Sequence, residues 1–378
     1  MPKSIPALVS PRMLLWARES IGMSLEEAAQ AADVDAARLA GWEHEPQAER
    51  PTIAQVRKLA AAYRRPLAAL FLPEPPREQQ LVADFRRLPG SPRDPSPELI
   101  VELRKAASRR EIALDLGAEL HELPPRFDLD AARNASPEAA AERVRERLGI
   151  DASVRKSWSE PYAALRAWRR RIEAQGVLVF QISGVAVEET RGFSCWYEPL
   201  PVIAMNSADA AVARVFTLAH ELGHLVRRKG AVCDMGEGAA EEAWCNRFAG
   251  ELLVPTDELA QEAEAYRAAW PDPELQRISR RFWVSQEVVL RRLVALELAS
   301  KDFYERWRSK RLGAVAPLGG GPVPLPKRLV SSAGATFVRL VLSAFHAELI
   351  SASTLAGYLG VKLKHLPAIE QLVVAEAG

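Results

Sequence analysis

Two histidines four residues apart, in the stretch FTLAHELGHL at 216–225, constrain this chain more than any other feature of its sequence. Four residues advance about 400° round an α-helix, so His220 and His224 project from one face, one turn apart. Glu221 follows the first histidine directly and lies about 100° further round the helix. The stretch therefore predicts a helix that presents two imidazoles and a neighbouring carboxylate to one site.

A pair of imidazoles with this spacing predicts a catalytic zinc site. Two imidazole nitrogens one turn apart can bind one Zn²⁺ at about 2.0–2.1 Å each, and the adjacent glutamate can take a proton from the attacking water. Catalytic zinc sites usually have three protein ligands. The metzincin spacing, with a third histidine at 230, is excluded because Gly230 stands there. We expect Glu242, in EEAWCNRFAGELLVP, to be the third ligand, with Glu241 as the main alternative.

Two other interpretations of the histidine pair stay open. The imidazoles could be paired with other groups in a helical core without any metal, or Cys233 or Cys245 could complete a Cys2His2-like site. Gly223 inside the motif favours a functional site. It leaves room beside the backbone, although glycine costs about 1 kcal/mol of helix propensity.

Composition limits the compartment and the partners. The 378 residues are 48% apolar and 26% charged, which is typical of a globular protein of about two to four domains. The formal net charge of +1 gives no general attraction to nucleic acid or membrane, so a nucleic-acid role must come from a motif. The first twenty residues lack the apolar core of a signal peptide, and no apolar run approaches a membrane span. Three cysteines give no disulfide framework, so we expect a cytoplasmic protein with no membrane partner.

The first part of the chain predicts a bundle of five short helices over residues 10–72. Ser10 before Pro11 marks a helix start, and Ser24 with Glu27 forms a capping box. Asp35 is the expected N-cap of the next helix. Two helices joined by a turn of about four residues form a helix-turn-helix, and helices over 52–63 and 66–72 complete the bundle.

Two regions of the chain resemble known protein families. The HExxH stretch followed by EEAWCNRFAGELLVP resembles the ImmA/IrrE family of bacterial zinc peptidases, over roughly residues 160–300. The family's third ligand falls on Glu242. The first helices resemble the Cro/C1-type (XRE) helix-turn-helix. Chains that join these two modules resemble a class of regulators whose peptidase cleaves a helix-turn-helix repressor, in stress responses or in mobile-element induction.

The expected fold is multidomain and mostly α, with an α+β zincin-like domain that contains a small sheet. Strand-like stretches at 177–183, 192–197 and 201–206 supply the sheet. A second helix pair with the helix-turn-helix shape is expected over 273–298, with Ser285 as N-cap. We assign the helix-turn-helix domain to 1–78, a helical linker to 79–150, the peptidase domain to 151–312, a Gly/Pro-rich linker to 313–330, and a small helical C-terminal module to 331–378.

The DNA-binding prediction has a weak electrostatic basis. The candidate recognition helix, 36–43, offers Ala36, Ala37 and Arg38 at its N-terminal end, of which only Arg38 is charged. Operator DNA is the expected partner, and a homodimer would match a palindromic operator. The alternative is a domain that docks a repressor or a second copy of the chain. The basic stretches 104–110 and 305–311 are expected to be solvated helix faces, with an auxiliary phosphate-binding surface as the alternative for 104–110.

Three functions fit these features. The first is a regulator with a zinc-dependent endopeptidase that cleaves a partner repressor, in which His220, His224 and Glu242 bind Zn²⁺ and Glu221 activates water. The second is a transcription factor whose peptidase-like domain senses a metal, a metabolite or a peptide without proteolysis. The third and weaker function is an antitoxin-type partner, which a neighbouring toxin gene would support.

Overall fold

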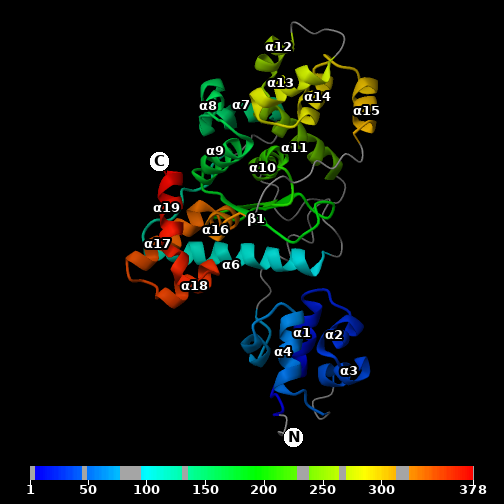
Figure 1. Cartoon of the computed structure of the whole chain (residues 1–378), viewed down its shortest axis with the longest axis vertical. Coiled ribbons are helices and arrows are strands. Elements are labelled where there is room, and N and C mark those ends of the chain that lie inside the picture. The colour runs from blue at the N-terminus through cyan, green and yellow to red at the C-terminus, as the bar shows by residue number, and fades with distance from the viewer. Residues whose placement is uncertain are drawn as a thin grey trace. The chain divides into compact units, whose positions relative to one another are not determined.

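A computed structural model describes residues 5–44, 49–76, 95–129, 135–227, 238–263, 270–311 and 323–377 of the chain (Figure 1). Within this part, contacts divide the chain into two compact units. The first unit ends at Ala107 and the second begins at Ser108, inside one long helix, α6 (Pro97–Glu119). Each unit has its own apolar core.

The first unit is the helix-turn-helix bundle that the sequence predicts. It consists of α1 (Pro11–Glu19), α2 (Leu25–Ala32), α3 (Ala36–His44), α4 (Ile53–Ala62), the short 3-10 helix η1 (Leu67–Phe71) and the first half of α6. Ser24 and Glu27 form the expected capping box of α2, and the Asp35 carboxylate accepts the Ala37 N–H at 2.8 Å. The fifth expected helix is a 3-10 helix, not an α-helix. Pro66 is its N-cap residue and provides no side-chain cap hydrogen bond, and short helical segments often take the 3-10 form.

A buried ion pair joins α1 to α3 in this bundle. The Arg18 guanidinium donates to both oxygens of Glu43, at 2.9 Å from Nε and 2.8 Å from Nη2, and also to the Met23 carbonyl at 3.0 Å. The Glu43 side chain is fully buried, and hydrogen bonds with this carboxylate raise the pKa of Arg18. The pair therefore fixes α3 relative to α1 and to the residue just before the N-cap of α2.

The second unit is built on a three-stranded sheet. Its strands are β1 (Leu178–Ile182), β2 (Gly192–Cys195) and β3 (Val202–Asn206), in the order β1-β3-β2. The central strand pairs in parallel with β1, Leu178 opposite Val202, and antiparallel with β2, Cys195 also opposite Val202. Every residue of β3 is buried, as expected for a strand covered on both faces.

Helices cover both faces of this sheet (Figure 1). On one side lie α9 (Pro161–Glu173) and α10 (Ala211–Val226), followed by α7 (Pro137–Leu148) and α11 (Gly238–Leu253). The remaining helices of this side are α8 (Ala152–Lys156), α12 (Thr256–Ala263), α13 (Asp272–Phe282), α14 (Gln286–Ala295) and α15 (Lys301–Ser309). The helix pair expected over 273–298 is confirmed as α13 and α14, with the Ser285 hydroxyl accepting the Val288 N–H.

The C-terminal helices form the layer on the other side of the sheet (Figure 1). They are α16 (Leu325–Ala333), α17 (Ala335–His346), α18 (Ala352–Leu359), the 3-10 helix η2 (Leu363–His365) and α19 (Leu366–Ala377). Phe337 packs edge-on against Phe180 of β1. The buried Arg169 of α9 donates to the Ser331 and Val179 carbonyls, and its partner Glu173 accepts the Thr336 hydroxyl. The expected C-terminal module is thus packed on the sheet as part of the second unit.

Two expected linkers differ from what the structure shows. The range 79–150 divides between the units, because the first half of α6 packs on the bundle while α7 packs on α11. Residues 77–94 lie outside the described part. The range 313–330 includes the start of α16 at Leu325, and residues 312–322 lie outside the described part.

The basic stretch 104–110 is a set of structural anchors, not a solvated face. Arg104 donates to the Ser20 carbonyl within the first unit. Within the second unit, Arg109 donates to the Ser332 carbonyl, and Arg110 donates to the Pro199 and Leu200 carbonyls. These guanidinium groups are therefore used inside their own units, which argues against an auxiliary phosphate-binding surface.

No single helix among the described residues is long and apolar enough to cross a membrane. The pair α16 and α17 meets the length and composition criteria only when taken together, and it is bent by 105°.

The buried pair of the first unit generates a stability prediction. Arg18→Met leaves the buried Glu43 carboxylate without its partner, so we expect the bundle to lose about 3–5 kcal/mol. Arg38→Met is the matched control, because its ion pair with Glu49 is exposed and contributes about 0–1 kcal/mol. Hydrogen–deuterium exchange of the α1–α4 amides in the full chain measures both. Equal losses of protection in the two variants would show that the buried pair does not hold the bundle.

Candidate metal centre

The candidate site is formed where α10 and α11 pack closely together. A Cβ atom at Gly223 of α10 would lie 3.0 Å from the Phe248 ring and 3.4 Å from the Cys245 sulfur, both on α11. Phe248 and Cys245 are fully buried, and the Phe248 ring stacks on Trp244. A side chain at 223 would push the helices apart, so glycine is what allows this approach. The sequence argument for room at Gly223 is confirmed.

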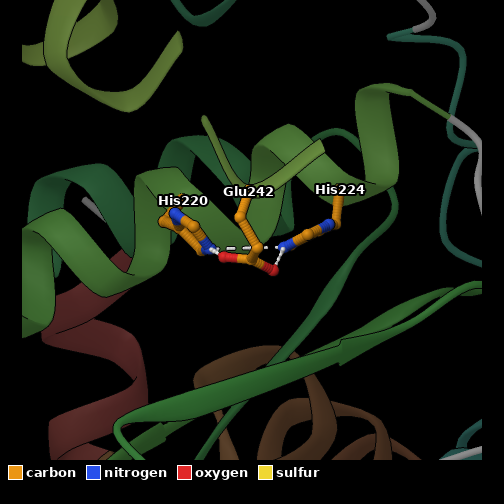
Figure 2. Close-up of side chains that lie close together, drawn as sticks. All are labelled: His220, His224 and Glu242. Carbon is orange, nitrogen blue, oxygen red and sulfur yellow. Dashed lines mark hydrogen bonds and ion pairs between the residues drawn. The ribbon is translucent and has the colours of Figure 1, made fainter. Parts of the chain in front are cut away.

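Three side chains converge at this contact. The Nε2 atoms of His220 and His224 are 3.2 Å apart, and the Glu242 carboxylate lies 3.3 Å from each of them. Figure 2 shows this carboxylate between the two rings, with one oxygen directed toward each. All three donor atoms lie within 4.8 Å of one another. The structure therefore brings together the three residues that the sequence predicts as ligands.

Glu241 has a different position from Glu242. Its carboxylate lies 3.4 Å from Nδ1 of His224, on the opposite side of the ring from Nε2, and the side chain is buried. A carboxylate on Nδ1 fixes the ring orientation and leaves the Nε2 lone pair directed at the cluster. This arrangement supports Glu242 over Glu241 as the candidate third ligand and places the Glu241 carboxylate where it can orient the His224 ring.

Electrostatics in the cluster favour a cation at its centre. Burial opposes protonation of His224, but hydrogen bonds with Cys245, Glu241 and Glu242 outweigh it and raise the pKa of this imidazole. Hydrogen bonds with His220 and His224 lower the pKa of Glu242 below its usual range. The cluster thus stabilises negative charge on the Glu242 carboxylate and positive charge beside this carboxylate.

The chemistry of the donor set fits Zn²⁺. Two imidazole nitrogens and one carboxylate oxygen are ligands of catalytic zinc sites, and they face a common point. A histidine pair with a purely structural role would have its ring nitrogens paired with separate core groups. Instead the two Nε2 atoms face each other, and Nδ1 of His220 is a buried nitrogen with no hydrogen-bond partner among the described residues. The geometry supports a metal site over paired core histidines.

The cysteine alternative receives no support from the described residues. Cys195 and Cys245 are buried and not joined in a disulfide, and Cys245 hydrogen-bonds His224 but is not among the three convergent donors. Burial raises the pKa of the Cys245 thiol, which disfavours the thiolate that zinc requires. Cys233 lies outside the described residues.

Glu221 has a hydrogen-bond partner that the sequence does not reveal. The Ser194 hydroxyl, on β2, donates to Oε2 of Glu221 at 2.7 Å, and both side chains are buried. Ser194 lies 27 residues before Glu221 in the chain and belongs to no motif. Only the packing of β2 against α10 brings Ser194 and Glu221 together, so no local sequence signal could have revealed this hydrogen bond.

The predicted DNA-contacting residues lie at the start of α3. Ala37 and Arg38 are exposed and Ala36 is half-buried. The Arg38 guanidinium pairs with Glu49 at 2.5 Å and lies over the Trp42 ring. The one cation of this helix end is therefore already paired with a carboxylate.

The chain therefore has two parts. The first is a bundle of the helix-turn-helix class, and the second is a domain whose HExxH helix presents a possible metal site. Residues 14–70 match the helix-turn-helix family, and residues 172–294 match the peptidase M78 family, described as the IrrE N-terminal-like domain. The chain is thus a fusion of these two domains, as the resemblances imply. The two matches support a DNA-binding regulator that carries an IrrE-like peptidase domain. No curated protein matches the chain.

The helix contact at Gly223 generates a prediction. Gly223→Ala inserts a methyl group against Phe248 and Cys245, so we expect overpacking to cost about 1–3 kcal/mol and zinc affinity to fall. Gly357→Ala, in α18, is the matched control, because a Cβ there meets no atom within 4 Å. It should stabilise the chain by about 0.5–1 kcal/mol. Thermal unfolding and zinc titration measure both variants. A Gly223→Ala chain as stable as the control variant would contradict the close-contact argument.

Proposed function

We propose that this chain is a regulator whose second unit is a zinc-dependent endopeptidase. The observation that carries the proposal is the convergence of His220, His224 and Glu242 within 4.8 Å, beside the motif glutamate Glu221. The match of residues 172–294 to a peptidase family supports the same class of reaction.

The proposed roles follow from the positions of the side chains. His220, His224 and Glu242 would hold Zn²⁺, which when bound supplies Lewis-acid polarisation of a peptide carbonyl. Glu221 takes a proton from the attacking water as the water oxygen bonds to the carbonyl carbon. It then passes this proton to the leaving amine nitrogen as the C–N bond breaks. Glu241 orients His224 through Nδ1.

The proposed substrate is an exposed segment of a partner protein, a helix-turn-helix repressor. This choice rests on the resemblance to fused regulators, which also implies a role in stress response or mobile-element control. The buried thiols Cys195 and Cys245, which form no disulfide, suit a reducing compartment, and we place the protein in the cytoplasm. A non-proteolytic sensor is the competing function, and the following experiment separates the two.

Three variants separate metal binding from chemistry. We expect about one zinc per wild-type chain and loss of zinc in Glu242→Ala, because one of three ligands is removed. Glu241→Ala should keep the site but bind zinc about 10–100-fold more weakly. Glu221→Gln should keep its zinc and lose activity, because the amide accepts no proton. Zinc is measured by elemental mass spectrometry, and cleavage with a pool of quenched-fluorescent octapeptides.

The outcomes of this experiment are distinct. Unchanged zinc in Glu242→Ala with loss in Glu241→Ala would exchange the roles of the two glutamates. A Glu221→Gln chain that binds zinc and cleaves at the wild-type rate would exclude the proposed mechanism. A wild-type chain that binds zinc but cleaves no peptide of the pool would favour the sensor.

The first unit is proposed to bind operator DNA through α3. Because Glu49 pairs with Arg38, Glu49→Gln should free the guanidinium and tighten binding, and Arg38→Ala should weaken it about 5–100-fold. The DNA affinity of both variants is measured by fluorescence anisotropy, with duplexes that the wild-type chain selects from a random pool. If the wild-type chain selects no duplex, the first unit docks a protein instead.

A further inference from the structure

The edge strand β2 packs against the metal-site helix in a fixed register. A Cβ atom at Gly192 would lie 2.5 Å from Cγ2 of Thr217 and 2.7 Å from the Ala204 carbonyl oxygen, so only glycine allows this approach. Residues 192 and 194 share one face of the strand, and residues 217 and 221 lie one turn apart on α10. The contact between Gly192 and Thr217 therefore sets Ser194 opposite Glu221.

The hydrogen bond between Ser194 and Glu221 occupies one carboxylate oxygen. Ser194 Oγ donates to Oε2 at 2.7 Å, and the two residues are only 6% and 8% exposed. The other oxygen, Oε1, makes no hydrogen bond with any described residue. A glutamate side chain has three rotatable bonds, of which the last has a broad preference. Without a partner no hydrogen bond would fix the rotation of the carboxylate about that bond.

We propose that Ser194 is a positioning residue that holds Oε2 of Glu221 and leaves Oε1 as the oxygen that takes the proton. Ser194 does not touch the substrate in this role. It restricts the rotation of a carboxylate that must lie within hydrogen-bond reach of the attacking water, and a misplacement of about 1 Å can cost about 100-fold in rate. The inference rests on the proposed peptidase function and assigns that site a residue outside its two motifs.

The test replaces the hydroxyl and then restores it. We expect Ser194→Ala to lower kcat by roughly ten- to a hundredfold toward an octapeptide that the wild type cleaves, with KM unchanged. Zinc content should stay at the wild-type value, because no ligand is altered. Ser194→Thr, which keeps the hydroxyl, should recover most of the lost kcat. Ser279→Ala is the control, because it removes an equally buried hydroxyl that bonds the Gln276 carbonyl in α13.

A second readout does not depend on activity. In a double-mutant cycle, Ser194→Ala should lower the melting temperature in the wild-type background and should have a smaller effect in a Glu221→Ala background. Additive shifts would overturn the inference, because they show that the two side chains are not coupled. Coupled shifts with an unchanged kcat would also overturn it, because the bond would then be only structural. If the wild type cleaves no octapeptide, the proposed function and this inference fail together; if Ser194→Ala cleaves as fast as wild type, this inference alone fails.

Discussion

The close packing of α10 against α11 at Gly223 is the contact on which the site depends. The HExxH helix supplies only two of the three donors, and the third comes from a different helix. Glu242 reaches the histidines because no side chain at 223 separates the two helices. Buried groups on α11 support this geometry from the far end. Arg292 of α14 donates to the Val254 carbonyl and pairs with the buried Glu251, which fixes the C-terminal end of α11.

The sheet supports the same helix from the other side. Gly192 allows β2 to lie against α10, and Ser194 then reaches Glu221. The C-terminal helices complete this support by covering the opposite face, with Arg169 and Glu173 linking them to α9 and β1. A segment that could have been an appended module is therefore packed into the same unit as the site, on the opposite face of the sheet. Its removal would expose the apolar face of β1.

The first unit has a helix-turn-helix fold with few polar side chains at the start of α3. Its caps and its buried Arg18–Glu43 pair stabilise the bundle without the residues at the N-terminal end of α3. The residues at that end are Ala36, Ala37 and Arg38, and Arg38 is already paired with Glu49. A helix that offers so few polar groups depends on backbone and on neighbouring contacts for affinity. The residues that stabilise the fold of this unit are therefore different from those that would set its affinity for DNA.

Local rules in the sequence determined the helices and their starts. The capping box at Ser24, the N-caps at Ser10 and Ser285, the three strands and the one-turn spacing of His220 and His224 all depend on neighbours within a few residues. The prediction of Glu242 as third ligand required a pattern on a second helix, and from the sequence Glu241 remained an alternative ligand. Only the tertiary structure separates the two, because they face opposite nitrogens of His224. It alone reveals Ser194 and the packing of the C-terminal helices on β1. Those contacts join segments 27 to about 160 residues apart, for which local sequence carries no signal.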